Sequence, residues 1–528
     1  MTYLDETNDN VSEALDMKAE NTVKTVFSKE NVKFADDRPS ETPILKLVDE
    51  LCKTLARENI SYCHWKSNNA LDRSASGEND LDLLIDRVDV RRFTEILYRL
   101  DFKEARPKPD KELPGVLNYY GHDTDTGRFV HIHAHYQLIL GDDASKNYRL
   151  PIEGPYLASA VQGELFKVPS IEFELIVFVI RMMLKHSTWD AMLSFHGSLS
   201  KSARQELDYL MARADRQRMQ ENLSQYLPFL DSAVFDRCLQ SLQPGASLMS
   251  RYKAGKQLHR QLQAHARSSR LSDTCLKMWH RGLWGTRKYL LRRPTKKYLI
   301  HGGAIIALVG GDGAGKSTAV NELHGWLSKR FAAKKIHMGK PRWALSTLFI
   351  KGVLKIGRKL GLFSNRKVPT QSQGDAQSLE LPGYGWFLWH VFTARDRYRT
   401  YARARRLATN GSLVICDRYP LPQIKTMDGA QTSRFLRAGK NKPLINFLIQ
   451  WEMKYYRHIL PPDLLIVMKV DPDIAVQRRA DEDADWIRGR SQEIWGLDWQ
   501  DAPVQIMDAG MPQARMLAEL KSLVWSRL

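Results

Sequence analysis

The sequence predicts an α/β protein whose C-terminal part is a parallel β-sheet with helices on both faces, preceded by a small α/β domain and a helical segment. At 528 residues the chain exceeds what one hydrophobic core supports, so two or three domains are expected. Apolar runs at residues 304–309, 413–416 and 464–470 are separated by helical stretches, which is the order of a parallel sheet. A continuous helical period begins at residue 171 and marks the middle segment.

The small α/β domain is predicted at residues 43–167, after a tail at residues 1–42. The tail begins with an acidic, polar stretch without the basic start and apolar run of a secretory signal, so we expect it to be disordered. Apolar runs and helical stretches alternate in the domain itself. The predicted elements are helices at residues 44–58 and 90–100 and strands at residues 62–65, 81–85 and 129–133.

The middle of the chain, residues 168–294, is predicted to be helical. Its most apolar stretch, residues 171–184, contains Glu172, Glu174 and Arg181 and is too short for a membrane span, so no transmembrane helix is expected. The basic, proline-containing stretch at residues 292–297 interrupts the helical pattern. It is therefore the predicted linker to a C-terminal domain at residues 298–528.

A glycine-rich loop follows the first strand of the C-terminal domain. Its residues are Gly310, Gly311, Asp312, Gly313, Ala314, Gly315, Lys316, Ser317 and Thr318, and a helical stretch comes directly after them. This order of strand, loop and helix is the context of a P-loop, in which backbone N–H groups and the helix N-terminus point at phosphates. The motif predicts that Lys316 reaches the β and γ phosphates of ATP and that the Ser317 hydroxyl ligates Mg²⁺.

Further segments of the C-terminal domain, in the right order, resemble those of the thymidylate kinase family. The loop itself is similar to that family's version, which has an acidic residue before the second conserved glycine. The other resembling segments are Phe-Thr-Ala-Arg-Asp-Arg at residues 392–397, Val-Ile-Cys-Asp-Arg-Tyr at residues 414–419, residues 462–479, and Met-Asp-Ala at residues 507–509.

This resemblance implies a kinase that transfers the γ-phosphoryl group of ATP to a nucleoside monophosphate, with dTMP to dTDP as the best single choice. It implies four catalytic residues, namely Lys316, Asp417, Arg418 and Arg479. It also implies that ATP contacts the loop, Arg478, Asp508 and Ala509, and that Ser317 and Asp417 hold Mg²⁺. The implied acceptor contacts are Arg397, Arg418 and Arg342. The implied arginines of a closing lid are Arg478, Arg479, Arg488 and Arg490.

Two departures from the family pattern concern the acceptor. Val309 stands where the family usually has a glutamate, and residues 337–342 replace the family's arginine-containing loop. A kinase of a sugar or another small acceptor in surface-polysaccharide synthesis therefore remains an open alternative.

The net charge of +19 is concentrated in two segments. Residues 251–300 contain fourteen Lys or Arg and the single acid Asp273, a net charge of +13, and residues 329–367 contain twelve Lys or Arg and no acid. Such segments attract a phosphorylated substrate, a nucleic acid or an anionic bilayer, or they are solvated helix faces. A nucleic-acid-binding or defence protein that uses ATP as a switch is thus a third alternative.

The second basic segment contains an amphipathic helical pattern. Its apolar face is formed by Leu345, Phe349, Val353, Ile356, Leu360 and Phe363, and the opposite face by Lys351, Lys355, Arg358 and Lys359. This helix either lies on an anionic membrane surface or packs its apolar face on the kinase core.

The five cysteines form neither a close pair nor a metal-ligand spacing, which is typical of a reducing compartment. We expect all five to be buried. The predicted location is the cytoplasm, with attachment to the inner membrane face if the amphipathic helix binds lipid. The oligomeric state is not predicted.

The small α/β domain resembles the nucleotidyltransferase superfamily through residues 64–68 and 77–85. Asp80 and Asp82 lie two residues apart on a strand, so their carboxylates point to the same face and can share divalent metals. Where the superfamily adds a third carboxylate, this chain has His131, His133 and His135. The histidines predict either a site for Zn²⁺ or Mn²⁺ or contacts to a substrate phosphate, and a binding or regulatory domain is favoured over an active transferase.

Overall fold

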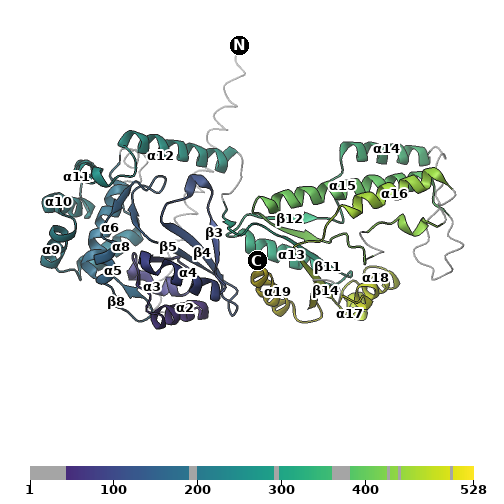
Figure 1. Cartoon of the computed structure of the whole chain (residues 1–528), viewed down its shortest axis with the longest axis horizontal. Coiled ribbons are helices and arrows are strands. Elements are labelled where there is room, and N and C mark those ends of the chain that lie inside the picture. The colour runs from purple at the N-terminus through teal and green to yellow at the C-terminus, as the bar shows by residue number, and fades with distance from the viewer. Residues whose placement is uncertain are drawn as a thin grey trace, which may run out of the picture. The chain divides into compact units, whose positions relative to one another are not determined.

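The computed structural model describes residues 43–188, 199–290, 296–359, 381–424, 429–437, 442–499 and 504–528 (Figure 1). The predicted tail at residues 1–42 and most of the predicted linker lie outside the described residues, as do Leu360 and Phe363. The α/β class and the parallel C-terminal sheet are confirmed.

The first sheet has six strands in the order β1-β2-β5-β4-β3-β10. The β2 and β5 strands are parallel, and the other neighbours are antiparallel. The strands are β1 (Tyr62–His64), β2 (Leu81–Ile85), β3 (Lys103–Arg106), β4 (Val116–His122), β5 (Phe129–His135) and β10 (Tyr298–Leu299). Two small hairpins accompany them, β6 (Leu138–Leu140) with β7 (Tyr148–Leu150) and β8 (Val161–Gln162) with β9 (Lys167–Val168).

One face of this sheet is covered by α2 (Lys46–Arg57) and α4 (Val90–Arg99). Leu81, Leu83 and Ile85 of β2 pack in the same core as these helices. Because successive strand residues point to opposite faces, Asp82 points away from the helices. The same alternation on β5 buries residues 130, 132 and 134 under the helices and directs the histidines of β5 to the face of Asp82.

The middle segment is helical, as predicted. Its helices are α6 (Ile171–His186), α8 (Lys201–Met211), α9 (Arg216–Tyr226), α10 (Ser232–Leu242), α11 (Leu248–Gln261) and α12 (Arg270–Gly285), and α5 (Glu153–Ala158) precedes the segment. The apolar α6 is buried along most of its length by α8, α9, α10 and α11. Serine or aspartate caps the start of α6 and of each of the helices α8 to α12, where its side-chain oxygen accepts a backbone N–H bond.

The strand β10 lies at the start of the predicted C-terminal domain but belongs to the first sheet. Tyr298 pairs with Arg106 and Leu299 with Ala105 of β3. A two-residue strand carries too little pattern for its partner to be recognised from the sequence.

The second sheet is parallel, with five strands in the order β12-β13-β11-β14-β15. The strands are β11 (Ile305–Gly310), β12 (Ala333–His337), β13 (Leu413–Asp417), β14 (Leu464–Lys469) and β15 (Val504–Asp508). The helices of this part are α13 (Lys316–Ser328), α14 (Leu345–Lys359), α15 (Tyr384–Thr409), α16 (Pro443–Arg457), α17 (Pro472–Gln477), α18 (Ala484–Gly496) and α19 (Gln513–Arg527).

Helices cover the second sheet on both faces (Figure 1). Ile306 and Leu308 of β11 pack with α13 and α19, while Ile305, Ala307 and Val309 pack with α15 and α18. The central strand is therefore buried on both sides, which explains its continuous apolar sequence.

The amphipathic helix α14 lies against α15, but its apolar face is open. Leu345, Phe349, Val353 and Ile356 are exposed by 86%, 72%, 46% and 60%, whereas Thr347 and Leu354 are buried. The expectation that this face packs on the kinase core is wrong for these four residues. None of the helices in the described parts of the chain is long and apolar enough to cross a membrane.

Candidate functional site

The glycine-rich loop connects β11 to α13 and needs glycine for two reasons. Gly313 and Gly315 have φ angles of +82° and +73°, in the region that residues with a side chain rarely adopt. A Cβ atom at Gly313 would also lie 2.8 Å from the carbonyl oxygen of Ala475. Because the cap residue Gly315 offers no side chain to the first amides of α13, these N–H groups form a donor set for an anion.

Lys316 lies inside this loop. Its side chain is buried and donates a 2.5 Å hydrogen bond to the carbonyl oxygen of Gly311. Burial lowers the pKa of Lys316 to about 8, the positive charge of Arg418 acts in the same direction, and Asp312 and Asp417 oppose both. A polyphosphate in the loop would supply the negative charge that this buried ammonium lacks.

Ser317 and Asp417 meet at the same point. Asp417 ends β13, which is parallel to β11, and its Oδ2 accepts a 3.1 Å hydrogen bond from Ser317 Oγ. A hydroxyl and a carboxylate beside a phosphate loop form the oxygen donor set that Mg²⁺ prefers, so these residues fit the ion.

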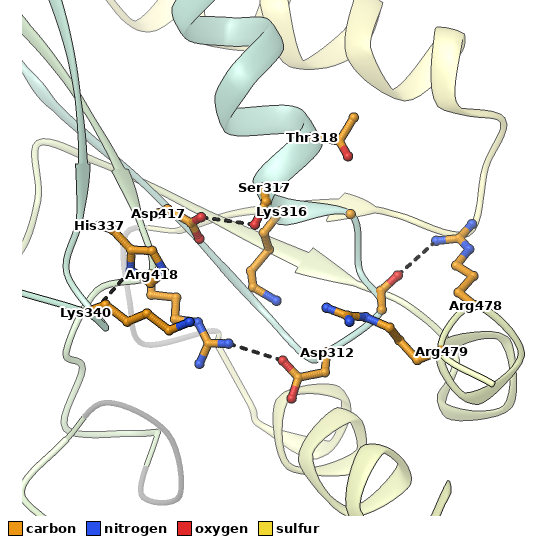
Figure 2. A pocket seen from close by; sticks show the side chains of 12 residues that line it. Asp312, Lys316, Ser317, Thr318, His337, Lys340, Asp417, Arg418, Arg478 and Arg479 are labelled. Atoms are coloured by element: carbon orange, nitrogen blue, oxygen red, sulfur yellow. Dashed lines mark hydrogen bonds and ion pairs between the residues drawn. The ribbon is translucent and has the colours of Figure 1, made fainter. Parts of the chain in front are cut away.

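The loop opens into a cavity of about 390 Å³ (Figure 2). Its lining includes Arg418, Arg478, Arg479, Lys340 and His337 in addition to the loop. His337 ends β12 and Lys340 follows it, and their side chains were not predicted as site residues. A sequence signal existed, because the carboxyl ends of parallel strands share one edge of the sheet and β12 neighbours β13.

Asp312 holds two of the arginines. Its Oδ1 accepts a hydrogen bond of 3.3 Å from Arg418, and its Oδ2 lies 2.9 Å from Nη1 of Arg490. Arg418 has a φ angle of +66°, a rare conformation outside glycine. This backbone geometry and the aspartate direct the guanidinium across the mouth of the loop (Figure 2).

The other predicted arginines occupy different positions. Arg478 donates a 2.8 Å hydrogen bond to the carbonyl oxygen of Ala509, and Arg479 pairs with Glu482 at 2.6 Å. Arg488 pairs with Asp473 at 2.8 Å outside the cavity. Only Arg478 and Arg479 of the four predicted lid arginines therefore line it.

The predicted acceptor residues Arg397 and Arg342 do not line the cavity. Arg397 is buried and donates to the Tyr456 hydroxyl at 2.6 Å and to the carbonyl oxygen of Gly339 at 3.3 Å, and Arg342 is exposed. Asp508 is exposed at the end of β15, where its Oδ1 accepts a hydrogen bond from the Gly510 amide.

A second group of polar residues lies on the face of the first sheet opposite α2 and α4. Asp80 Oδ1 is 2.7 Å from Nδ1 of His131, and Asp82 Oδ1 is 3.3 Å from Nδ1 of His133 and 3.6 Å from Nε2 of His135. Burial lowers the pKa of His131 to about 3 and that of His135 to about 4. Burial opposes ionisation of Asp80, yet contacts with His131 and His133 outweigh it and lower the pKa of this carboxyl. The cluster is thus two carboxylates facing three imidazoles, of which the buried His131 and His135 are uncharged at neutral pH.

Four of the five cysteines are buried, as expected, but Cys275 on α12 is exposed. The expectation for Cys275 is wrong because α12 presents much of its surface to solvent, including Leu271, Met278 and Trp279.

No family model matches the sequence. Over 229 residues the chain is 24% identical to the uncharacterized ATP-binding protein YghR of Escherichia coli strain K12, a match that covers 42% of this chain and 86% of YghR. Over 230 residues it is 26% identical to the uncharacterized ATP-binding protein YghS of the same strain, covering 42% of this chain and 92% of YghS. Both relatives are named for ATP binding, and neither name states a reaction.

Proposed function

We propose that the C-terminal domain binds ATP in the glycine-rich loop and transfers its γ-phosphoryl group to a nucleoside monophosphate, with dTMP the first candidate. The convergence of the loop, the Ser317–Asp417 pair and several cationic side chains on one cavity is the observation that carries this proposal. The names of YghR and YghS support the ATP half of it.

The donor half of the site is the better supported half. The amides at the start of α13 would hold the phosphates of ATP, and Lys316 would bind the β and γ phosphates. Ser317 and Asp417 would hold Mg²⁺, which in such a complex neutralises charge on the donor phosphates. Asp508 and Ala509, at the end of β15, would lie beside the adenine.

Transfer between two anions requires positive charge around the moving group. Arg418, Arg479 and Lys340 line the cavity and carry that charge. Asp312 would act by orienting Arg418 and Arg490, since its two carboxylate oxygens contact one guanidinium each. Arg478 and Arg479 would close over the transferring group and exclude water.

The acceptor half supports a second candidate, a kinase of a sugar or another small molecule. Arg397 is engaged by Tyr456 and Gly339 and does not line the cavity, whereas His337 and Lys340 from the divergent loop do. An acceptor recognised by His337 and Lys340 would differ from the one that the family resemblance implies.

An ADP-release screen tests both candidates. Wild-type protein with Mg²⁺ and ATP is offered nucleoside monophosphates, dTMP first, and then sugars and sugar phosphates. We expect Lys316→Ala and Asp417→Asn to lower kcat by at least about 100-fold, because each removes charge stabilisation from the transition state. Arg515→Ala, an exposed residue paired with Glu519 on α19, is the matched control and should keep wild-type turnover.

Acceptor-dependent ADP release that persists in Lys316→Ala would contradict the assigned loop. Release that depends on a sugar and not on dTMP would exclude the nucleotide acceptor and leave the kinase assignment standing.

We also propose that α14 attaches this domain to an anionic lipid surface. Its exposed stripe, Leu345, Leu348, Phe349, Val353 and Ile356, has the spacing of one helix face. Residues 329–367 contain no acid, so the segment is complementary to anionic headgroups and not to a mixed-charge protein surface. Apolar insertion beside exposed lysines such as Lys351 and Lys355 is the arrangement of interfacial helices.

Vesicle co-sedimentation tests this attachment. We expect the full chain to bind phosphatidylglycerol-containing vesicles, to bind phosphatidylcholine vesicles weakly, and to dissociate as salt rises. Phe349→Glu with Ile356→Glu should reduce binding at least about 10-fold, because both charges would enter the apolar layer. Val88→Glu, at an exposed apolar residue outside α14, is the control.

Equal binding by the double variant would contradict the assignment of the stripe. Binding to DNA with no binding to vesicles would replace the lipid with a nucleic acid.

A further inference from the structure

The face of the first sheet opposite α2 and α4 contains a cluster that the proposed kinase reaction does not use. Asp80, Asp82, His131, His133 and His135 come together there because β2 and β5 are adjacent parallel strands with Asp82 opposite His133. The cluster contains two overlapping triads, Asp80–His131–His133 and Asp82–His133–His135, and in each the possible ligand atoms lie within 4.8 Å of one another.

Several of the nitrogen atoms are buried without hydrogen-bond partners. Among the described residues, both ring nitrogens of His135 have no hydrogen-bond partner, and Nδ1 of His131 has none except the Asp80 carboxylate, whose Oδ1 is 2.7 Å away. His131 and His135 are only 4% and 8% exposed. An unsatisfied buried nitrogen costs free energy, so the arrangement calls for a group that accepts these lone pairs.

The two triads differ in how their ligand atoms are engaged. In the second triad, Asp82 Oδ1 is already 2.9 Å from the ammonium group of Lys66. In the first triad, the lysine contacts the other nitrogen of the His131 ring, since Lys297 Nζ is 2.9 Å from Nε2 and the candidate ligand atom is Nδ1. The atoms Asp80 Oδ1 and His131 Nδ1 themselves have no lysine contact among the described residues.

We propose that Asp80, His131 and His133 form a binding site for one divalent transition-metal ion of the Zn²⁺ class. Two imidazoles and one carboxylate are a donor set that suits Zn²⁺ and does not suit Mg²⁺, which prefers oxygen ligands. Asp80 and His133 are 35% and 28% exposed at their side chains, so the ion has an entry path and an open coordination position. Asp82 and His135 lie next to the site and add negative charge and a further imidazole.

Asn118 fixes the ring of His131 for this role. With the metal on Nδ1, the proton of the neutral imidazole must be on Nε2, and Asn118 Oδ1 lies 3.2 Å from Nε2 to accept it. The ammonium group of Lys297 donates to the same Nε2 when Nδ1 carries the proton. Lys297 and the metal therefore require opposite tautomers of His131, so they compete.

The competition between Lys297 and the metal ion for His131 can be tested by measuring Zn²⁺ affinity. Isothermal titration of the nucleotide-free full chain with Zn²⁺ should give one site per chain, and titration with Mg²⁺ should give no comparable site. His133→Ala should weaken Zn²⁺ binding at least about 10-fold, and Lys297→Met should strengthen it, because the opposing ammonium is gone. His301→Ala, an exposed histidine outside the cluster, is the control.

The visible spectrum of bound Co²⁺ gives a second readout that reports imidazole ligation directly. If His133→Ala does not fold, as judged by circular dichroism, His133→Gln replaces it at this partly exposed position. Unchanged Zn²⁺ affinity in the His133 variant, or no gain in Lys297→Met, would overturn the site. A Lys297→Met variant whose thermal stability changes but whose Zn²⁺ affinity does not rise would also contradict the site.

Discussion

At the scale of single residues, burial changes the charge state of individual side chains. Glu174 on α6 is an example, because its carboxylate accepts hydrogen bonds from the backbone and side-chain nitrogens of Asn68, at 3.2 Å and 2.9 Å. Burial nevertheless raises the pKa of Glu174 to about 7, and the two bonds from Asn68 only partly oppose this. An acid that is ionised in the unfolded chain is therefore protonated in the folded protein between about pH 4.5 and 7.

The raised pKa of Glu174 predicts how stability depends on pH. The folded state binds the extra proton, so the stabilisation is complete below the unfolded pKa and is lost as pH rises through about 7. We expect the free energy of unfolding of the wild type to fall by up to about 3 kcal/mol between pH 5 and pH 8 because of this group. Glu174→Gln should make the free energy of unfolding depend less on pH over this range. The exposed Glu221→Gln is the control, and an unchanged slope in Glu174→Gln would contradict the assignment.

At the scale of elements, one aspartate attaches the amphipathic helix α14 to α15. Asp396 of α15 is 1% exposed, and its Oδ2 accepts hydrogen bonds from the Ala344 amide and the Thr347 hydroxyl at the start of α14. It therefore caps α14 from another helix and satisfies donors that have no partner within α14.

The cap predicts how easily α14 opens. Asp396→Ala should increase the rate of tryptic cleavage at Lys351 and Lys355 roughly 10-fold, which corresponds to the loss of about 1.4 kcal/mol of local stability. Asp396→Asn keeps an acceptor oxygen and should fall between this variant and wild type. Asp208→Ala, an exposed position on α8, gives the baseline, and equal cleavage rates in all four proteins would show that α14 is held by other contacts.

At the scale of the whole molecule, the net charge of +19 does not form one continuous basic surface, because many of the cations make contacts within the protein. In residues 251–300, Arg251 donates to the carbonyl oxygen of Ser241, Lys277 and Arg281 pair with Asp142, and Arg287 pairs with Asp110. Asp142 and Asp110 therefore offset part of the positive charge that suggested a nucleic-acid partner, and several of these cations are engaged within the protein. The α14 segment differs because its sequence neighbourhood contains no acid to pair with.

The secondary structure could be predicted closely from the sequence wherever an apolar period was long enough. The strand at residues 81–85 and the helical middle segment agree with prediction, because alternation and the 3.6-residue period are local properties. The strands β3 and β4 and the short strands β6 to β9 were not predicted. The strands β6 to β9 have only two or three residues each, and so few residues form a strand only when a partner is present.

The residues of the candidate site that belong to local motifs could also be predicted, whereas those positioned by tertiary contacts could not. The loop, Asp417 and Arg418 were found from local motifs, and they line one cavity. His337 and Lys340 line the cavity but were not predicted as site residues. Arg397 and Arg342 were predicted to contact the acceptor but do not line the cavity. The direction of a side chain depends on tertiary contacts, such as the hydrogen bond from Arg397 to Tyr456.

The class of fold, the phosphate loop and the histidines of β5 could be read from residue order, because each depends on a short stretch of the chain. The open apolar face of α14, the contact of Lys297 with His131 and the pairing of β10 with the first sheet became visible only in the folded chain. These features depend on which distant segments meet, and pairing between distant segments leaves no period in the chain.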